Sequence, residues 1–158
     1  TDVTLVAKAA WREATRLRFI PDGADGGRAL APGAQPAPGI QPPGMESDPH
    51  ARTLEVDAID IPALLREEPF DFVKIDIEGA ERAVIPASAG ALGNVSYIFV
   101  EYHGISTEKP ALASVIAPLE QAGFRIQVHT VRSPAHPFFE GDTARDYDLI
   151  LHIYGSRA

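Results

Sequence analysis

The sequence predicts an open α/β sheet, and three observations carry that prediction. Two apolar runs, Phe70–Ile77 and Val95–Tyr102, are typical of parallel strands buried on both faces. A helical pattern follows each run, and two alternating runs close the chain. Strand, helix, strand, helix and two closing strands form the second half of such a sheet, and right-handed crossovers would place helices on both faces.

The size and composition of the chain agree with one compact domain over residues 1–158. It has 158 residues, of which 45% are hydrophobic and 23% charged, so it can bury a sizeable core. No internal repeat is evident. We therefore predict one domain rather than two.

The first third of the chain predicts short strands followed by a loop. Val3–Val6 is strand-like, and Thr15–Ile20 alternates weakly with arginines, which favours an edge strand. Seven prolines and many glycines lie within Pro21–Pro49, so we predict a long surface loop at about residues 21–50. Gly26-Gly27 lies in this loop without a preceding buried strand, and we do not interpret it as a phosphate cradle.

Local signals define the next elements. We expect a strand at Arg52–Val56 and a helix at Ile61–Glu67, with Asp60 as its N-cap. After the apolar run that ends at Ile77, a helix should begin near Gly79 and weaken by Pro86, because proline in a helix removes a hydrogen bond and clashes with the preceding turn.

The last third predicts a helix and an antiparallel strand pair. Pro110–Gln121 carries apolar residues at helical spacing, and Gly123 is the expected stop. The closing runs each present apolar side chains on one face, which favours a pair at a sheet edge. These apolar residues are Phe124, Ile126 and Val128 in the first run and Tyr147, Leu149, Leu151 and Ile153 in the second.

Charge and cysteine content exclude several partners. The net charge is −8, from 22 acids against 14 bases, so we expect neither nucleic-acid nor membrane binding. Without cysteine, disulfides and thiolate zinc sites are excluded. No apolar run approaches a spanning helix and the N-terminus lacks a signal-peptide pattern, so a cytoplasmic location is the default. The start at Thr1, almost on a strand-like run, leaves open whether the chain is a fragment.

Polar residues stand where two predicted parallel strands end. Asp76 and Glu78 follow the first strand, with Glu81 one helical turn later, and Glu101 and His103 lie two apart on one face of the second. Ligands of open α/β sheets bind beyond these strand ends. If the strands are neighbours, the carboxylates and the imidazole converge in an arrangement suited to proton transfer or to a hard divalent ion.

A purely structural interpretation stands beside this one. Acids are favoured at a helix N-terminus, and Lys74, on the same strand face, can simply neutralise Asp76. His103 taken alone is better read as a structural histidine. Other polar or aromatic residues are interpreted as surface, loop, core or lid positions: His50, His129, His136, His152, Trp11 and the pair Phe138-Phe139.

The run from Asp71 to Glu81, DFVKIDIEGAE, is similar, nearly letter for letter, to the signature of the FkbM family of S-adenosylmethionine-dependent methyltransferases. Val3–Trp11, Leu54–Leu65 and Tyr97–His103 resemble further blocks of that family in the same order. The resemblance covers most of the chain outside the Pro/Gly-rich loop.

The resemblance implies a class I methyltransferase (Rossmann-like) open sheet, S-adenosylmethionine as donor, and a hydroxyl of a sugar, polyketide or related small molecule as acceptor. It implies that Asp76 lies nearest the reacting methyl and contacts the cofactor. Glu78, Glu101 and His103 would bind acceptor hydroxyls, act as base or hold a cation. The residues that could hold the cation are Asp76, Glu78 and His103. Lys74 and Glu81 would bind substrate or support the site.

One departure from the family pattern limits this expectation. The Gly-rich cofactor turn and the acid that binds the ribose both belong before Val3–Val6, which resembles the third strand, so the sheet would lack its first two strands. The leading hypothesis is therefore the acceptor-side portion of an O-methyltransferase. Two alternatives stay open: a degenerate binding or scaffold module, and a metal-dependent hydrolase using Asp76, Glu78 and His103. Acceptor, metal requirement and oligomeric state are not predicted.

Overall fold

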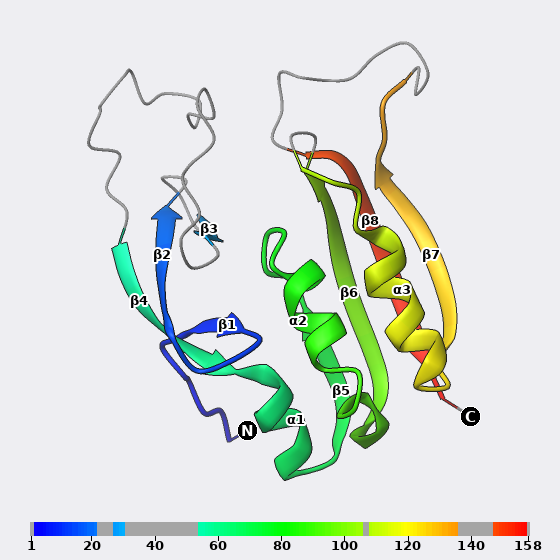
Figure 1. Ribbon diagram of the computed structural model, residues 1–158. Helices are drawn as coiled ribbons and strands as arrows, with labels where there is room; N and C mark the ends of the chain where they lie inside the picture. The colour runs from blue at the N-terminus through cyan, green and yellow to red at the C-terminus, as the bar shows by residue number, and fades with distance from the viewer. Residues whose placement is uncertain (1, 22–26, 31–53, 106–107, 136–146, 158) are drawn as a thin grey trace, which may run out of the picture.

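The computed structural model describes residues 2–21, 27–30, 54–105, 108–135 and 147–157, and they form two four-stranded sheets with three α-helices (Figure 1). The first sheet has the strand order β1-β4-β2-β3 and the second β5-β6-β8-β7. The mixed α/β class predicted from the sequence is confirmed. The expectation of one open sheet is not, because the described strands divide into two.

The first sheet is built around β4. This strand, Leu54–Asp60, pairs in parallel with β1, Ala9–Trp11, and antiparallel with β2, Arg16–Pro21. The outer strand β3, Gly27–Leu30, pairs with β2. The small core under this sheet consists of Trp11, Leu17, Ala58 and Ala80.

Two predictions for this region were wrong, and part of the predicted loop is a strand. Val3–Val6 is not a strand: the side chains of Val3 and Leu5 are 83% and 88% exposed, and none of the described strands pairs with this segment. The strand predicted at 15–20 lies between two partners rather than at an edge. The predicted loop contains β3, whose pairing with β2 is a tertiary event that proline content does not reveal; residues 22–26 and 31–53 lie outside the described ones.

The second sheet holds most of the core. Strand β5, Phe70–Ile75, runs parallel to β6, Val95–Ile105, and β6 is antiparallel to β8, Tyr147–Ser156. The edge strand β7, Arg125–Arg132, pairs with β8. The predicted antiparallel pair at a sheet edge is thus confirmed.

The helices follow their sequence signals. In α1, Ile61–Glu67, the Asp60 carboxylate accepts a hydrogen bond of 2.7 Å from the amide of Ala63, as expected of an N-cap. Helix α2 spans Glu81–Ala87 and contains Pro86 in its last turn. Among the described residues, no helix is long and apolar enough to cross a membrane.

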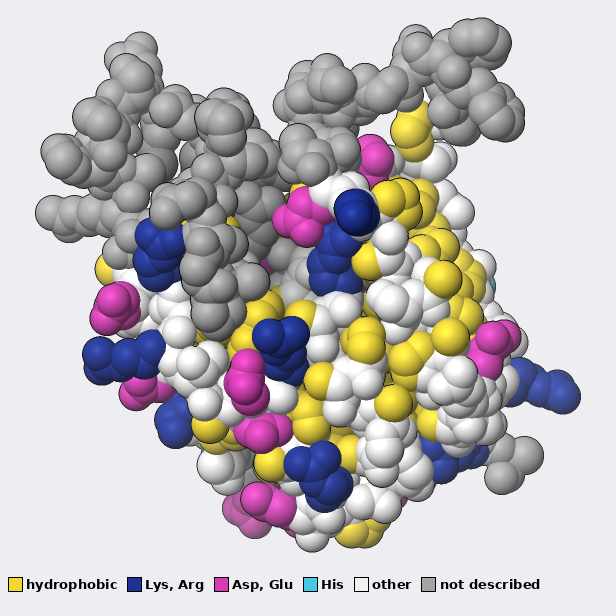
Figure 2. Space-filling model, viewed as in Figure 1, with side chains coloured by type: hydrophobic (Ala, Val, Ile, Leu, Met, Phe, Trp, Pro, Cys, Tyr) yellow, Lys and Arg dark blue, Asp and Glu magenta, His cyan; other side chains and the backbone are white. Residues whose placement is uncertain are grey.

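The third helix, α3, spans Leu112–Gln121, and Gly123 follows it with a φ of +86°, which explains the glycine at the predicted stop. A short 3-10 helix, η1, occupies Leu92–Asn94 before β6. Helices α2 and α3 lie side by side over the second sheet (Figure 1). Viewed from that side, hydrophobic side chains (yellow) and uncharged or backbone atoms (white) predominate over these two helices, while charged side chains are more frequent toward β2 and β4 (Figure 2).

The two faces of the second sheet differ sharply. On one face, Ile98, Val100 and Ile153 pack with Val115 and Leu119 of α3, all at most 2% exposed. Helices cover only that face in the described part of the chain, so the prediction of helices on both faces was wrong. The opposite face carries Phe72 and Tyr97, which are 59% and 54% exposed.

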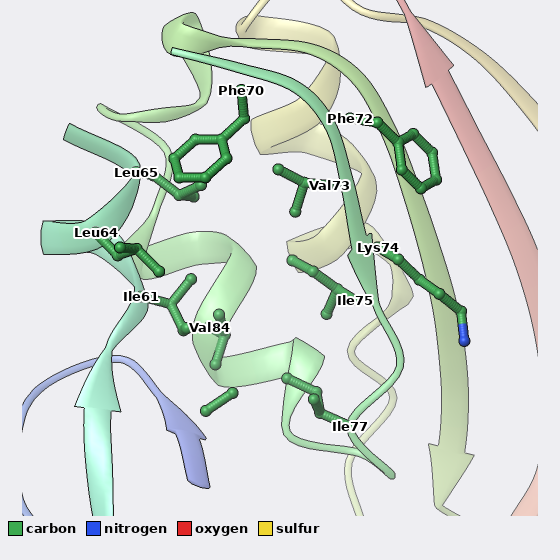
Figure 3. Close-up of a pocket in the computed structure, with 11 residues that line it drawn as sticks. Ile61, Leu64, Leu65, Phe70, Phe72, Val73, Lys74, Ile75, Ile77 and Val84 are labelled. Carbon is green, nitrogen blue, oxygen red and sulfur yellow. The ribbon is translucent and has the colours of Figure 1, made fainter. Parts of the chain in front are cut away.

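Strand β5 was predicted to be central and buried on both faces, and this was also wrong. It stands at the end of its sheet, and within the described residues its only strand partner is β6. A mainly apolar groove of about 280 Å³ follows its other edge, between β5 and the helices α1 and α2. Val73 and Ile75 point into the groove, whereas Phe72 and Lys74 lie on the other side of the strand (Figure 3). A run of apolar residues indicates that its side chains tend to be buried, but it does not indicate how many strands lie beside it.

Candidate functional site

Strand pairing brings the two predicted polar clusters together. In the parallel pair of β5 and β6, Ile75 lies opposite Val100, so Asp76 and Glu101 follow at adjacent strand positions. Strand β6 continues past that point, paired with β8, and carries His103. The condition set from the sequence, that the two strands be neighbours, is therefore met.

His103 lies at the centre of the cluster. Its Nε2 is 3.5 Å from a carboxylate oxygen of Glu78 and 3.7 Å from one of Glu101, and its Nδ1 is 3.3 Å from Oε1 of Glu81. The side chain is 3% exposed, whereas those of Glu78 and Glu101 are partly accessible. The site therefore joins a buried imidazole to two carboxylates that reach solvent.

The electrostatics of His103 follow from these contacts. Burial lowers its pKa, but the contact with Glu81 and the charges of Glu81, Glu78 and Glu101 outweigh burial, and the pKa is raised. The imidazole thus keeps its proton to a higher pH than a free histidine.

Glu81 has a structural task that the sequence did not reveal. Its side chain is fully buried; Oε2 accepts a hydrogen bond of 2.9 Å from the amide of Gly79, and Oε1 accepts one of 2.6 Å from the amide of His103. One carboxylate thus ties the turn after β5 to strand β6. The helix dipole alone would have been satisfied by an exposed acid at this position.

The turn after β5 has an unusual backbone. Glu78 has a φ of +52° and Gly79 a φ of +95°, a region that side chains with a Cβ rarely adopt. A Cβ at Gly79 would also lie 2.8 Å from Cδ1 of Ile105. Left-handed conformations at non-glycine residues cluster at functional sites, where the surrounding structure holds them in place. Here the hydrogen bond from Gly79 to Glu81 holds the turn and directs Glu78 toward His103.

The plain ion-pair interpretation holds for one pair. Lys74 Nζ lies 2.9 Å from Oδ2 of Asp76, and this hydrogen bond and charge raise the pKa of Lys74. The ammonium also lies 5.8 Å from the centre of the Phe99 ring. Lys74 therefore neutralises Asp76, as expected from their shared strand face.

Two site residues were missed. His152, assigned from the sequence to the surface or a loop, stands opposite Glu101 in the pairing of β6 with β8, and its Nε2 is 3.1 Å from Oε2 of Glu101. Tyr147 packs its ring against His103, with centroids 4.8 Å apart, and its hydroxyl lies 3.4 Å from the carbonyl of Glu78. The alternation of the closing run placed both on a strand, but only strand register shows what they contact.

The remaining residues that were assigned from the sequence to the core, surface or loops lie outside the site or outside the described residues. Trp11 is buried in the core of the first sheet, as predicted. His129 is exposed on β7. Gly27 begins β3. His50, His136, Phe138 and Phe139 lie outside the described residues.

The cluster also contains a set of potential metal ligands. Asp76, Glu78 and His103 each offer one ligand atom, and the three atoms lie within 4.8 Å of one another. This is the set that the sequence predicted as a possible cation site. The described residues that surround it thus combine acceptors for a hydroxyl proton with donors for a cation.

A family model described as "Methyltransferase FkbM domain" matches residues 8–126, about three quarters of the chain. The chain belongs to the FkbM methyltransferase family. The matched region contains every site residue contributed by β5, the following turn and β6, whereas Tyr147 and His152 lie beyond it. Comparison with curated proteins and with solved structures gave no match.

Proposed function

We propose that this FkbM-family chain forms the acceptor-binding portion of an S-adenosylmethionine-dependent O-methyltransferase that acts on a hydroxylated small molecule. The observation that carries the proposal is the convergence of Glu78, which follows the end of β5, with Glu101 and His103 on the neighbouring parallel strand β6, inside the region matched by the family. An open crevice at such strand ends is where ligands bind in α/β sheets.

The described residues fit only part of a site for S-adenosylmethionine. In class I methyltransferases a Gly-rich turn after a parallel strand cradles the cofactor, and among the described residues we find a single glycine, Gly79, at such a position. When bound, the cofactor supplies a methyl group on a positively charged sulfur. The tasks derived below concern only the acceptor and the residues of this chain.

The carboxylates suit the deprotonation of an acceptor hydroxyl. Glu101 is partly accessible; its Oε2 is held by His152 at 3.1 Å, and its Oε1 lies 3.7 Å from Nε2 of His103. An acceptor hydroxyl donating to Glu101 or Glu78 would lose its proton to that carboxylate as its oxygen forms the new bond. His103 would hydrogen-bond the hydroxylated acceptor through Nε2, which lies 3.5 Å from Glu78 and 3.7 Å from Glu101.

The groove beside β5 supports the proposal that part of the sheet comes from elsewhere. A strand edge without a partner in the described residues, flanked by an apolar groove of about 280 Å³, is suited to accept a further strand. We propose that a complementary segment, including the Gly-rich turn, pairs there with β5. On this proposal the present chain alone binds S-adenosylmethionine weakly or not at all.

Calorimetric titration of S-adenosylmethionine tests this division of labour. We expect tight binding by an N-terminally extended version and little by the chain of 158 residues. Equal, tight binding by both would overturn the claim that part of the cofactor site is missing.

In the extended version, Glu101→Gln should slow methylation of a panel of hydroxylated acceptors by about 10²-fold or more, with exposed Glu67→Gln as the matched control. If the extended protein methylates no hydroxylated acceptor, the alternative of a non-catalytic binding module gains support.

A further inference from the structure

We propose that Asp76, Glu78 and His103 form a binding site for a divalent transition-metal ion, with Mn²⁺ or Zn²⁺ bound in preference to Mg²⁺ or Ca²⁺. The inference does not depend on methyl transfer, because cation binding can be measured without cofactor or acceptor. It rests on the spacing of the three ligand atoms, on the state of the His103 ring, and on the chemistry of the donor set.

The spacing suits one shared ion. Two atoms each about 2.1 Å from an octahedral ion are about 3.0 Å apart at adjacent corners and about 4.2 Å apart at opposite corners. The three candidate atoms already lie within 4.8 Å of one another, and Nε2 of His103 is 3.5 Å from Oε2 of Glu78. Small side-chain rotations of the two acids would bring all three into coordination distance.

The His103 ring supplies the second observation. It is 97% buried, counted from its 3% exposure, and its Nδ1 makes no hydrogen bond in the described structure. Nε2 points between Glu78 and Glu101 at 3.5 Å and 3.7 Å, which is longer than the usual 2.7–3.2 Å of an N–H···O hydrogen bond. The ring as a whole is buried, and its Nε2 is directed at two carboxylates at distances longer than a hydrogen bond, which leaves space for an ion between them.

The other side of the ring resembles the surroundings of a metal-bound histidine. Nδ1 faces the buried carboxylate of Glu81 at 3.3 Å. Histidines that bind a metal through one ring nitrogen commonly turn the other toward a carboxylate, which fixes the ring and raises its basicity. Because Glu81 also binds the amides of Gly79 and His103, the same carboxylate positions both the turn carrying Glu78 and the strand carrying the imidazole.

The donor set decides the class of ion. Ca²⁺ and Mg²⁺ prefer shells of oxygen atoms alone, whereas imidazole favours Zn²⁺ and other transition metals, and carboxylates suit Mn²⁺. Two carboxylates and one imidazole therefore favour an ion that accepts both. Partly exposed Asp76 and Glu78 leave the remaining coordination positions open to solvent or to an oxygen ligand.

Lys74 competes with a metal ion for Asp76. Its ammonium forms an ion pair with Oδ2 of Asp76 at 2.9 Å, so a metal ion must bind the other carboxylate oxygen or displace the lysine. The Lys74 side chain is more than half exposed and can swing into solvent. Removing this positive charge should therefore strengthen metal binding, a direction opposite to that expected from loss of a ligand.

Calorimetric titration of Mn²⁺ and of Zn²⁺ into chelator-treated protein tests the site, with folding of each variant verified by circular dichroism. Asp76→Asn and Glu78→Gln should weaken binding by at least about tenfold. Lys74→Met should strengthen it severalfold. Asp71→Asn, an exposed acid earlier on β5, is the matched control and should change nothing.

Spin-echo spectroscopy of bound Mn²⁺ should detect the nitrogen of one imidazole, and the signal should persist in His152→Gln, which removes the other imidazole of the cluster. The proposal is overturned if neither ion binds, if the Asp76 and Glu78 variants bind as tightly as the parent chain, if Mg²⁺ binds as tightly as Mn²⁺, or if no nitrogen is detected. Each of these outcomes is independent of whether the extended protein methylates an acceptor.

Discussion

The two faces of the second sheet use the same strands for different purposes. On the helix-covered face, one row across the sheet consists of Ile75, Val100, Ile153 and, at the edge, Val128. On the open face, the next row consists of Glu101, His152 and His129. Successive residues of a strand point to opposite faces, so each functional residue stands beside a core residue in the sequence.

The difference teaches where stability and chemistry reside. The covered face excludes water and carries apolar side chains packed against α2 and α3. The open face carries exposed aromatic residues at one end, Phe72 and Tyr97, and the cluster around His103 at the other. We therefore expect substitutions on the covered face to reduce stability, and those on the open face to change binding with little effect on stability.

The largest expected effect is on the covered face. Ile153→Ala removes a fully buried side chain from the middle of the sheet and should lower the free energy of unfolding by about 2–5 kcal/mol, because it leaves a cavity. Tyr97→Ala, on the open face of β6, is the control and should cost less than about 1 kcal/mol. Urea denaturation followed by circular dichroism measures both. Equal losses would contradict the distinction between the faces.

Glu81→Gln tests the buried carboxylate that links helix α2 to the turn after β5 and to strand β6. The side-chain oxygen of glutamine can accept a hydrogen bond from the backbone N–H of Gly79 or of His103. The second backbone N–H would then face the side-chain NH₂ group, which cannot accept a hydrogen bond. We expect a loss of about 1–3 kcal/mol in the free energy of unfolding, since one buried donor is left unsatisfied. Glu120→Gln, at an exposed position of α3, is the matched control. A loss no larger than that of the control would show that Glu81 does not clamp the turn.

The smallest stability effect is expected at the open end of the sheet. Phe72→Ser should change the free energy of unfolding by no more than about 0.5 kcal/mol, because the side chain is mostly exposed. It should nevertheless reduce the fluorescence of a dye that binds apolar surfaces, since exposed Phe72 lies opposite exposed Tyr97 on the open face. Val131→Ser, an exposed apolar position on β7, is the control. A large loss of stability, or an equal loss of fluorescence in both variants, would contradict an accessible apolar surface at Phe72.

Local signals in the sequence predicted much of the fold because their causes are local. Asp60 caps α1 through an amide three residues away, and Gly123 ends α3 because its backbone adopts a positive φ. The family signature around Asp76 and Glu78 was recognised for the same reason, as a short contiguous run, and the family match confirmed it. The separation of Glu101 and His103 by two residues correctly placed them on one strand face.

Strand neighbours and burial could not be predicted in this way. The position of β5 at a sheet end, the two separate sheets and the pairing of His152 with Glu101 each depend on residues far apart in the sequence. Glu81 has the residue type expected at any helix start, and only the approach of β6 turns it into a buried acceptor for two amides.

The sequence by itself determined the family, the helices and the residue types at the strand ends, because capping, periodicity and motif are properties of neighbouring residues. Only the tertiary structure decided which face of the sheet is open, how the acids surround His103, and that an apolar groove follows β5. These features arise from strand register and from burial summed over distant segments, and neither quantity is carried by any short stretch of the chain.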